Sequence, residues 1–264
     1  MKNSLLAEKV IVIIGGTTGL GFSAAKAFVL EGAKVIVVGR DSKAAARAEK
    51  QIGPAAAAMA ADATHPETAE AAISQAVDLF GGFHGLYHVA GGSGRGQGDG
   101  PLHKIPDDGW HQTLQHNLDA VFYSNRAAAI RFMRQGKGGS ILNMGSVLAF
   151  SPSPGHFATH AYATAKAAIL GLTRSAAAFY APHNIRFNLL APGLVATPMS
   201  QRAQKDPAVL EFIKTKQPLD GGRIAHPADC DAAAVYFLSD ASRFVTGQVL
   251  GVDGGWTVSE GQLA

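Results

Sequence analysis

The sequence contains little cysteine, few charged residues and no long hydrophobic run. Its single cysteine, Cys230, excludes a disulfide within the chain, and its alanine-rich surroundings favour a packed helical position over a reactive thiol. The apolar run at residues 10–14 is too short for a signal peptide or a membrane span, and Glu8 and Lys9 precede it. We therefore expect a cytoplasmic protein without a membrane anchor.

Charged residues make up only 16% of the chain, compared with about 25% in average proteins. We expect other copies of the chain to cover part of a surface with so little charge. The net charge of +3 is spread along the sequence without a basic stripe, which argues against nucleic-acid binding. Ten histidines are present, but none belongs to a His-Glu-x-x-His motif, so we expect no metal site.

Short apolar runs alternate with alanine-rich helical segments along the whole chain. This alternation predicts an α/β fold, a doubly wound parallel sheet of about seven strands with helices on both faces, in a single domain over residues 1–264. Residues 55–61 could be low-complexity sequence or a short buried strand, and we favour the strand. The other expected strands are residues 10–14, 35–38, 85–89, 140–144, 185–190 and 248–252.

A tyrosine and a lysine, Tyr162 and Lys166, are four residues apart and so share one face of a predicted helix. An ammonium ~4 Å from a phenol, at an effective dielectric of ~20, would contribute about 4 kcal/mol, which lowers the phenol pKa by at most ~3 units. Desolvation opposes part of that shift. Upstream, Ser146 ends a strand-like run, at the edge where open α/β sheets bind ligands. The three residues together indicate acid/base chemistry.

A glycine-rich turn, Gly15-Gly-Thr-Thr-Gly-Leu-Gly21, follows the first expected strand and precedes a predicted helix. Its glycines allow a tight turn and a close approach of backbone to a pyrophosphate. The free N–H groups at the start of the helix would then attract that anion.

In this order, the motifs resemble the short-chain dehydrogenase/reductase family over residues 6–256, and the resemblance implies a Rossmann-type fold. It implies four catalytic residues: Asn117, Ser146, Tyr162 and Lys166. It also implies that the cofactor contacts Gly15, Thr17, Thr18, Gly19, Leu20, Gly21, Arg40, Asp62, Ala90, Gly91, Tyr162, Lys166, Pro192, Gly193, Val195 and Thr197. The segment from Thr246 to Gly255 matches the family's carboxyl-terminal signature.

The resemblance implies reversible hydride transfer between a nicotinamide cofactor and a carbonyl or alcohol carbon. Tyr162 would give or take the proton, and Ser146 would hold the substrate oxygen. Lys166 would lower the pKa of Tyr162 and bind the nicotinamide ribose, while Asn117 would hold a water that links Lys166 to solvent. Family members are mostly tetramers, so we expect a homotetramer that buries residues 253–256 between subunits.

The cofactor preference depends on Gly39-Arg40-Asp41, at the end of the second expected strand. An arginine here pairs with the 2′-phosphate of NADP, whereas an acid holds the 2′-hydroxyl of NAD. Arg40 is the first side chain after the glycine, so NADP is the preferred cofactor, and Asp41 leaves NAD open. Thr18 stands where many NADP-dependent relatives carry a basic residue.

The sequence departs from the family pattern at two places. The usual Asn-Asn-Ala-Gly reads His88-Val-Ala-Gly91, and the loop at residues 147–161 is longer than is common. In relatives the asparagines brace the sheet beside the cofactor, so the local geometry is in question. The long loop is expected to shape a substrate pocket.

Three loops are expected to surround the substrate. Residues 91–100, with six glycines, favour a flexible loop in which Arg95 could touch an anionic substrate. Residues 194–222 are either a surface helix or a lid, and we favour a lid. Apolar Leu148, Phe150 and Phe157 indicate a hydrophobic ketone or secondary alcohol, and His160 is either a pocket residue or an ordinary loop histidine.

Two other classes of function remain open. A methyltransferase of similar fold does not need Ser146, Tyr162 and Lys166 together, and a non-catalytic nucleotide-binding scaffold would ordinarily have lost one of them. A 3-oxoacyl-carrier-type reductase is a substrate variant of the same reaction. Basic and acidic residues alternate over residues 202–220, so no surface for an acidic carrier protein stands out.

Overall fold

A computed structural model describes residues 4–261 of the protein. It contains one parallel sheet with the strand order β3-β2-β1-β4-β5-β6-β7. The strands are β1 Val10–Ile14, β2 Lys34–Gly39, β3 Ala56–Ala60, β4 Gly85–His88, β5 Gly139–Met144, β6 Ile185–Pro192 and β7 Val249–Val252. The α-helices are α1 Gly19–Leu30, α2 Ser42–Ile52, α3 Thr68–Phe80, α4 Asp107–Leu114, α5 Ala120–Gln135, α6 His160–Tyr180, α7 Gln201–Lys205, α8 Pro207–Lys216 and α9 Asp231–Leu238.

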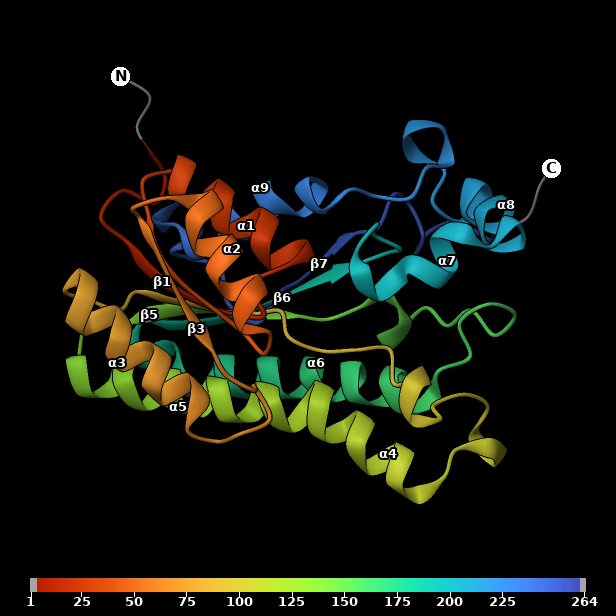
Figure 1. Ribbon diagram of the computed structural model, residues 1–264, viewed down its shortest axis with the longest axis horizontal. Coiled ribbons are helices and arrows are strands. Elements are labelled where there is room, and N and C mark those ends of the chain that lie inside the picture. The colour runs from red at the N-terminus through yellow and green to blue at the C-terminus, as the bar shows by residue number, and fades with distance from the viewer. Residues whose placement is uncertain (1–3, 262–264) are drawn as a thin grey trace.

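Helices cover both faces of the sheet (Figure 1). Alternate side chains of β1 point to opposite faces, which is why both faces need a cover. Ile11 and Ile13 pack with α1, α2 and α9, and Val12 and Ile14 pack with α3, α5 and α6. The predicted doubly wound fold is therefore confirmed, and residues 55–61 do contain a strand, β3, which pairs with β2.

The strand order determines at which edge of the sheet a ligand can bind. After β3 the chain returns to the other side of β1, so neighbouring loops diverge at the carboxyl ends of β1 and β4. The loops after β4, β5 and β6 all leave at this edge, and α7 and α8 lie beyond it (Figure 1). No helix within residues 4–261 has the length and apolar character needed to cross a membrane.

Candidate active site

The predicted catalytic residues meet at the carboxyl end of β5. Ser146 follows this strand and caps a short 3₁₀ turn, its Oγ accepting from the Leu148 N–H at 3.2 Å. Tyr162 and Lys166 are one turn apart on α6, with Lys166 Nζ 5.6 Å from the centre of the Tyr162 ring. Lys166 Nζ donates to the Met144 carbonyl at 2.8 Å, which ties α6 to the end of β5. All three residues, with Asn117, line one cavity, the central cavity.

Burial governs the pKa values of this cluster. It lowers the pKa of Lys166 to about 8, because the buried ammonium loses its hydration. It raises the pKa of Tyr162, and hydrogen bonding with the Ser146 side chain opposes that rise. The expected fall of the Tyr162 pKa below its usual value is therefore not found in the protein alone, because burial raises that pKa by more than the hydrogen bonding with Ser146 lowers it.

Asn117 lies in a π-helical segment, Gln115–Asp119, between α4 and α5. Its buried side chain uses both of its polar atoms. Nδ2 donates to the carbonyls of Thr113 (2.9 Å) and Gly92 (3.0 Å), while Oδ1 accepts from the Gly92 N–H at 3.0 Å. Asn117 thus fastens the loop after β4 beside the catalytic cluster. That it holds a water for Lys166 stays a prediction.

The glycine turn forms a second cavity next to the central cavity, here called the glycine groove. A Cβ at Gly21 would come within 2.2 Å of the Gly15 carbonyl oxygen, so the turn requires glycine there. No side chain caps the start of α1, which leaves its N–H groups for an anion. The predicted cofactor residues that line this groove are Gly15, Thr17, Thr18, Gly19, Leu20, Arg40, Asp62, Ala90, Gly91 and Thr197. Pro192, Gly193 and Val195 line the central cavity.

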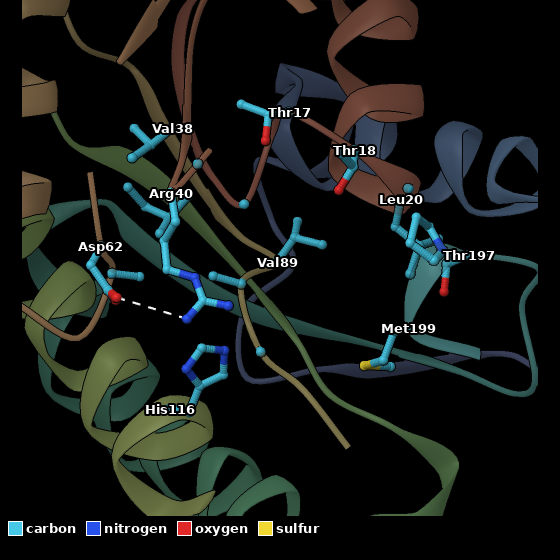
Figure 2. Close-up of a pocket in the computed structure, with 18 of the residues that line it drawn as sticks. Thr17, Thr18, Leu20, Val38, Arg40, Asp62, Val89, His116, Thr197 and Met199 are labelled. Atoms are coloured by element: carbon cyan, nitrogen blue, oxygen red, sulfur yellow. Dashed lines mark ion pairs between the residues drawn. The ribbon is translucent and has the colours of Figure 1, made fainter. Parts of the chain in front are cut away.

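Arg40 and Asp62 face each other at the far end of the groove (Figure 2). Arg40 Nη1 lies 3.8 Å from Asp62 Oδ2. Burial alone would raise the pKa of Asp62, but hydrogen bonds from Thr64 and the charge of Arg40 lower it overall. Asp41 is occupied elsewhere, because its carboxylate accepts from the Ala44 N–H at 2.6 Å and caps α2.

His88 takes over the bracing that the missing asparagines would provide. Its ring is fully buried, with Nδ1 2.7 Å from Ser124 Oγ on α5 and Nε2 3.2 Å from the Ala90 carbonyl. Burial, aided by the charge of Lys166, lowers its pKa to about 3, so the ring is neutral. The sheet beside the groove is therefore still linked to α5.

A third cavity, the apolar cavity, opens beside Ser146 and Tyr162 and has a volume of about 270 Å³. Its lining includes Ser93, Arg95, Val147, Leu148, Phe157, Thr159, Leu194, Met199, Ser200, Arg202, Ala203 and Trp256. Leu148 and Phe157 lie where expected. Phe150 does not line the cavity and is 46% exposed. His160 is an exposed residue at the start of α6 and lies outside the lining.

Sequence reasoning missed three residues that shape the site. Asp99, 6% exposed, accepts from the N–H groups of Ala161 (3.0 Å) and Tyr162 (2.9 Å) at the start of α6. The glycine-rich loop is therefore held at this end, contrary to the expectation of a flexible loop. Trp256 is buried against Phe157 of its own chain, with ring centres 5.6 Å apart, rather than left for a subunit interface.

Gln217, the third missed residue, joins the two ends of residues 194–217. Its buried side-chain amide accepts from the Leu194 N–H and donates to the Leu194 carbonyl. The intervening α7 packs through Ala203, and α8 through Val209 and Ile213, into the cluster that contains Trp256. Nothing local in the sequence marks these contacts, because each joins residues that are far apart along the chain.

Known proteins resemble this chain over most of its length. A family model described as enoyl-(acyl carrier protein) reductase matches residues 15–257. The 2,5-dichloro-2,5-cyclohexadiene-1,4-diol dehydrogenase of Sphingobium indicum is 35% identical over 96% of this chain and 98% of its own. The chain belongs to the short-chain dehydrogenase/reductase family. It is an oxidoreductase that acts on CH–OH groups, and members of this family use NAD(P).

Two further known proteins support this family assignment. Galactitol 2-dehydrogenase (L-tagatose-forming) from Cereibacter sphaeroides is 34% identical, over 93% of this chain and 94% of its own. A solved short-chain type dehydrogenase/reductase from Mycobacterium ulcerans superimposes with a TM-score of 0.88 at 29% identity, covering 96% of this chain and 91% of that one.

Within residues 4–261, no group of three or more His, Cys, Asp or Glu side chains is arranged to hold a metal. Cys230 is buried as expected, and burial raises the pKa of its thiol to about 12.

Proposed function

We propose that the protein transfers a hydride between NADP(H) and the carbon of a hydrophobic secondary alcohol or ketone, with Tyr162 as general acid/base. The observation that carries this proposal is the position of the central cavity. It shares Leu20, Gly91 and Thr197 with the glycine groove, and Ser146 and Tyr162 with the apolar cavity. A cofactor in the groove and a substrate in the apolar cavity would therefore meet at the catalytic residues.

The glycine groove fits a dinucleotide. Gly15 has φ +88° and Gly19 has φ +55°, so this turn exposes backbone that a side chain would block. The uncapped start of α1 supplies N–H groups for the pyrophosphate. Pro192, Gly193, Val195 and Thr197 would hold the nicotinamide end. When bound, the nicotinamide supplies or accepts the hydride.

The roles of the protein's own residues follow from their contacts. The Tyr162 hydroxyl would exchange a proton with the substrate oxygen, which the Ser146 hydroxyl would hold by a hydrogen bond. Lys166, kept in place by the Met144 carbonyl, would stabilise the phenolate once it forms. Asn117 would keep the loop after β4 in position. The raised pKa of Tyr162 favours the protonated phenol, which suits proton donation in the reducing direction.

The contacts of Arg40 and Asp41 support NADP as the preferred cofactor. Arg40 lines the groove, its side chain is 65% exposed and its only ion pair among the described residues, with Asp62, is 3.8 Å long. It could therefore turn to a 2′-phosphate. Asp41 caps α2 and would have to give up that bond to reach a ribose hydroxyl. A Cβ at Gly39 would lie 2.1 Å from Thr17 Oγ1, so an acid in place of this glycine would require the Thr17 side chain to move.

We also propose that residues 194–222 form a lid over the substrate and that the protein is a homotetramer. Leu194, Met199, Ser200, Arg202 and Ala203 line the apolar cavity, which supports the lid. Two sets of exposed apolar side chains, each called a patch, support two kinds of subunit interface. One consists of Phe122, Ile130 and Met133 on α5, with Phe179 on α6, and the other of Tyr236, Phe244 and Leu250.

A spectrophotometric assay tests the reaction. The purified protein, supplied with NADPH or NADP⁺ and a panel of aliphatic, alicyclic and aromatic ketones and alcohols, should change the absorbance of the reduced nicotinamide with at least one substrate. A protein that binds NADPH but turns over no member of a broad panel would be the non-catalytic scaffold instead. A protein that binds no nicotinamide nucleotide at all would contradict the proposal.

A further inference from the structure

Two arginines from separate segments converge at the apolar cavity. Arg95 belongs to the loop after β4, Arg202 belongs to α7, and both line the cavity that contains Ser146 and Tyr162. Arg95 Nη2 donates to the His156 carbonyl at 3.2 Å, and Arg202 Nη2 donates to the same oxygen at 3.3 Å. Two positive charges thus share one neutral acceptor.

The two arginines differ in their acidic partners. Arg202 lies 3.5 Å from Asp206, one turn further along the lid. Arg95 forms no ion pair with any described residue, although it feels the charge of Asp99, whose carboxylate also accepts from the N–H groups of α6. Burial, and next the charge of Arg202, lower the pKa of Arg95 by more than the charge of Asp99 raises it, so the two guanidinium groups repel each other. An anion placed between them would relieve that repulsion.

The rest of the cavity lining is mostly apolar. Val147, Leu148, Phe157, Leu194 and Trp256 form its walls, and the reactive hydroxyls of Ser146 and Tyr162 belong to the same lining. Guanidinium groups bind planar carboxylates through two parallel hydrogen bonds. A cavity of about 270 Å³ suits a small molecule, below the usual ~300–1,000 Å³ range of ligand pockets.

Resting on the proposed function, we propose that the substrate is a small hydrophobic hydroxy acid or keto acid whose carboxylate binds between Arg95 and Arg202. The alcohol or ketone carbon then lies at Ser146 and Tyr162, and the hydrocarbon between them packs against the apolar walls. Arg95 and Arg202 are specificity-determining residues. They take no part in proton transfer.

A binding experiment tests this proposal without turnover. The protein saturated with NADP⁺ is titrated with cyclohexanecarboxylate and, separately, with the neutral isostere cyclohexanecarboxamide. Calorimetry gives the affinity, and tryptophan fluorescence, to which Trp256 in the cavity wall contributes, is a second readout. The carboxylate should bind about ten- to a hundredfold more tightly, the range of a charge-assisted pair. Arg95→Gln and Arg202→Gln should each remove most of that preference, because they weaken carboxylate binding much more than carboxamide binding. Arg47→Gln, the same change on an exposed position of α2, should leave both unchanged.

A turnover experiment separates this inference from the proposed reaction. NADPH oxidation is followed with 4-oxocyclohexanecarboxylate and with its methyl ester. We expect a kcat/KM for the acid at least about tenfold above that for the ester, an advantage lost in Arg95→Gln and Arg202→Gln. Turnover of both ketones without preference for the acid would overturn the inference and leave the reaction standing. Equal binding of carboxylate and carboxamide would also overturn it, whereas tight carboxylate binding without any turnover would count against the reaction alone.

Discussion

The buried carboxylate of Asp99 holds the backbone of Tyr162 at 2.9 Å, across 63 positions of sequence. Through this bond, the loop after β4 fixes the first turn of the helix that carries the hydroxyl proposed to transfer the proton. A carboxylate at the start of a helix is also favoured by the positive end of the helix dipole. Asp99 is therefore a positioning residue, which acts on the reaction through Tyr162.

Replacing Asp99 by Asn should weaken both the helix cap and catalysis. The amide has one acceptor oxygen in place of two, so one N–H of α6 is left without a partner. We expect a loss of about 0.5–2 kcal/mol in the free energy of unfolding, typical of a lost cap, and a several-fold fall in kcat with little change in the Kd for NADPH. Urea denaturation and steady-state kinetics measure the two effects.

Ser239→Ala provides the control for Asp99→Asn. Ser239 is a buried cap at the far side of the molecule, its Oγ accepting from the Ala241 N–H at 3.2 Å. Its loss should cost similar stability without lowering kcat. An equal fall of kcat in both variants would show that Asp99 contributes stability only.

Tyr162→Phe keeps the packed ring and removes the hydroxyl that is proposed to exchange the proton. We expect kcat to fall by about 10²- to 10⁴-fold, the usual contribution of a general acid/base, with the Kd for NADPH close to that of the unchanged protein. Tyr180→Phe, at the other end of the same helix, should retain activity. Residual turnover above about a tenth of the original would show that Tyr162 is not the general acid/base.

Arg40→Ala separates the two nicotinamide cofactors. A guanidinium–phosphate contact in a partly exposed groove is worth on the order of 1.5–3 kcal/mol, so the KM for NADPH should rise about ten- to a hundredfold. The KM for NADH should stay nearly constant, because NADH has no 2′-phosphate. If the unchanged protein prefers NADH, or if the variant binds both cofactors equally weakly, Asp41 rather than Arg40 is the residue that selects the cofactor, through the ribose hydroxyl.

His88 should make stability depend on pH. Its pKa is about 3 in the folded protein, compared with 6.5 in an unfolded chain. Above about pH 6.5 both states carry a neutral ring, and as the pH falls only the unfolded state takes up the proton. The free energy of unfolding should therefore decrease by about 2 kcal/mol between pH 8 and pH 5 through this group.

His88→Asn isolates that contribution, since the amide does not titrate. Urea denaturation of both proteins from pH 8 to pH 5 should show a steeper loss of stability in the unchanged protein. Parallel curves would mean that His88 is protonated in the folded state or that its ring is reached by water.

Ile130→Glu should divide the proposed tetramer. Ile130 is 46% exposed and lies in the apolar patch on α5, so a carboxylate there would be buried at any interface formed by this helix. Light scattering should report a tetramer for the unchanged protein and a smaller species for the variant. Leu79→Glu, at an exposed position of α3 outside both patches, is the matched control. A 27.3 kDa monomer at micromolar concentration in the unchanged protein would remove the proposal and the explanation for the sparse charge.

The sequence predicted the parts of the molecule whose signals are local. Runs such as residues 10–14 are apolar because both faces of the sheet are covered, and Ser146 could be located because ligands bind at strand ends. The pair of Tyr162 and Lys166 followed from the helical repeat. Each of these inferences uses only neighbours along the chain.

Contacts between distant segments could not be predicted in this way. Asp99 meets α6 through a loop whose composition indicates only flexibility. Trp256 reaches the apolar cavity from the carboxyl-terminal segment, and the sequence does not say whether its partner is its own chain or another. His88 stands where the family pattern has an asparagine, so the sequence indicated that a motif was lost. The structure shows that its imidazole forms a polar link to Ser124 on α5.

The pairing of Gln217 with Leu194 limits how the lid could open. The side-chain amide binds both backbone groups of a residue 23 positions away, as a neighbouring strand would, and so closes the intervening segment into a loop with a fixed base. Such a loop can tilt about its base but cannot slide along the protein. Substrate entry would then depend on rotation of α7 and α8 as one flap, with Arg202 swinging away from His156 while Leu194 stays where it is.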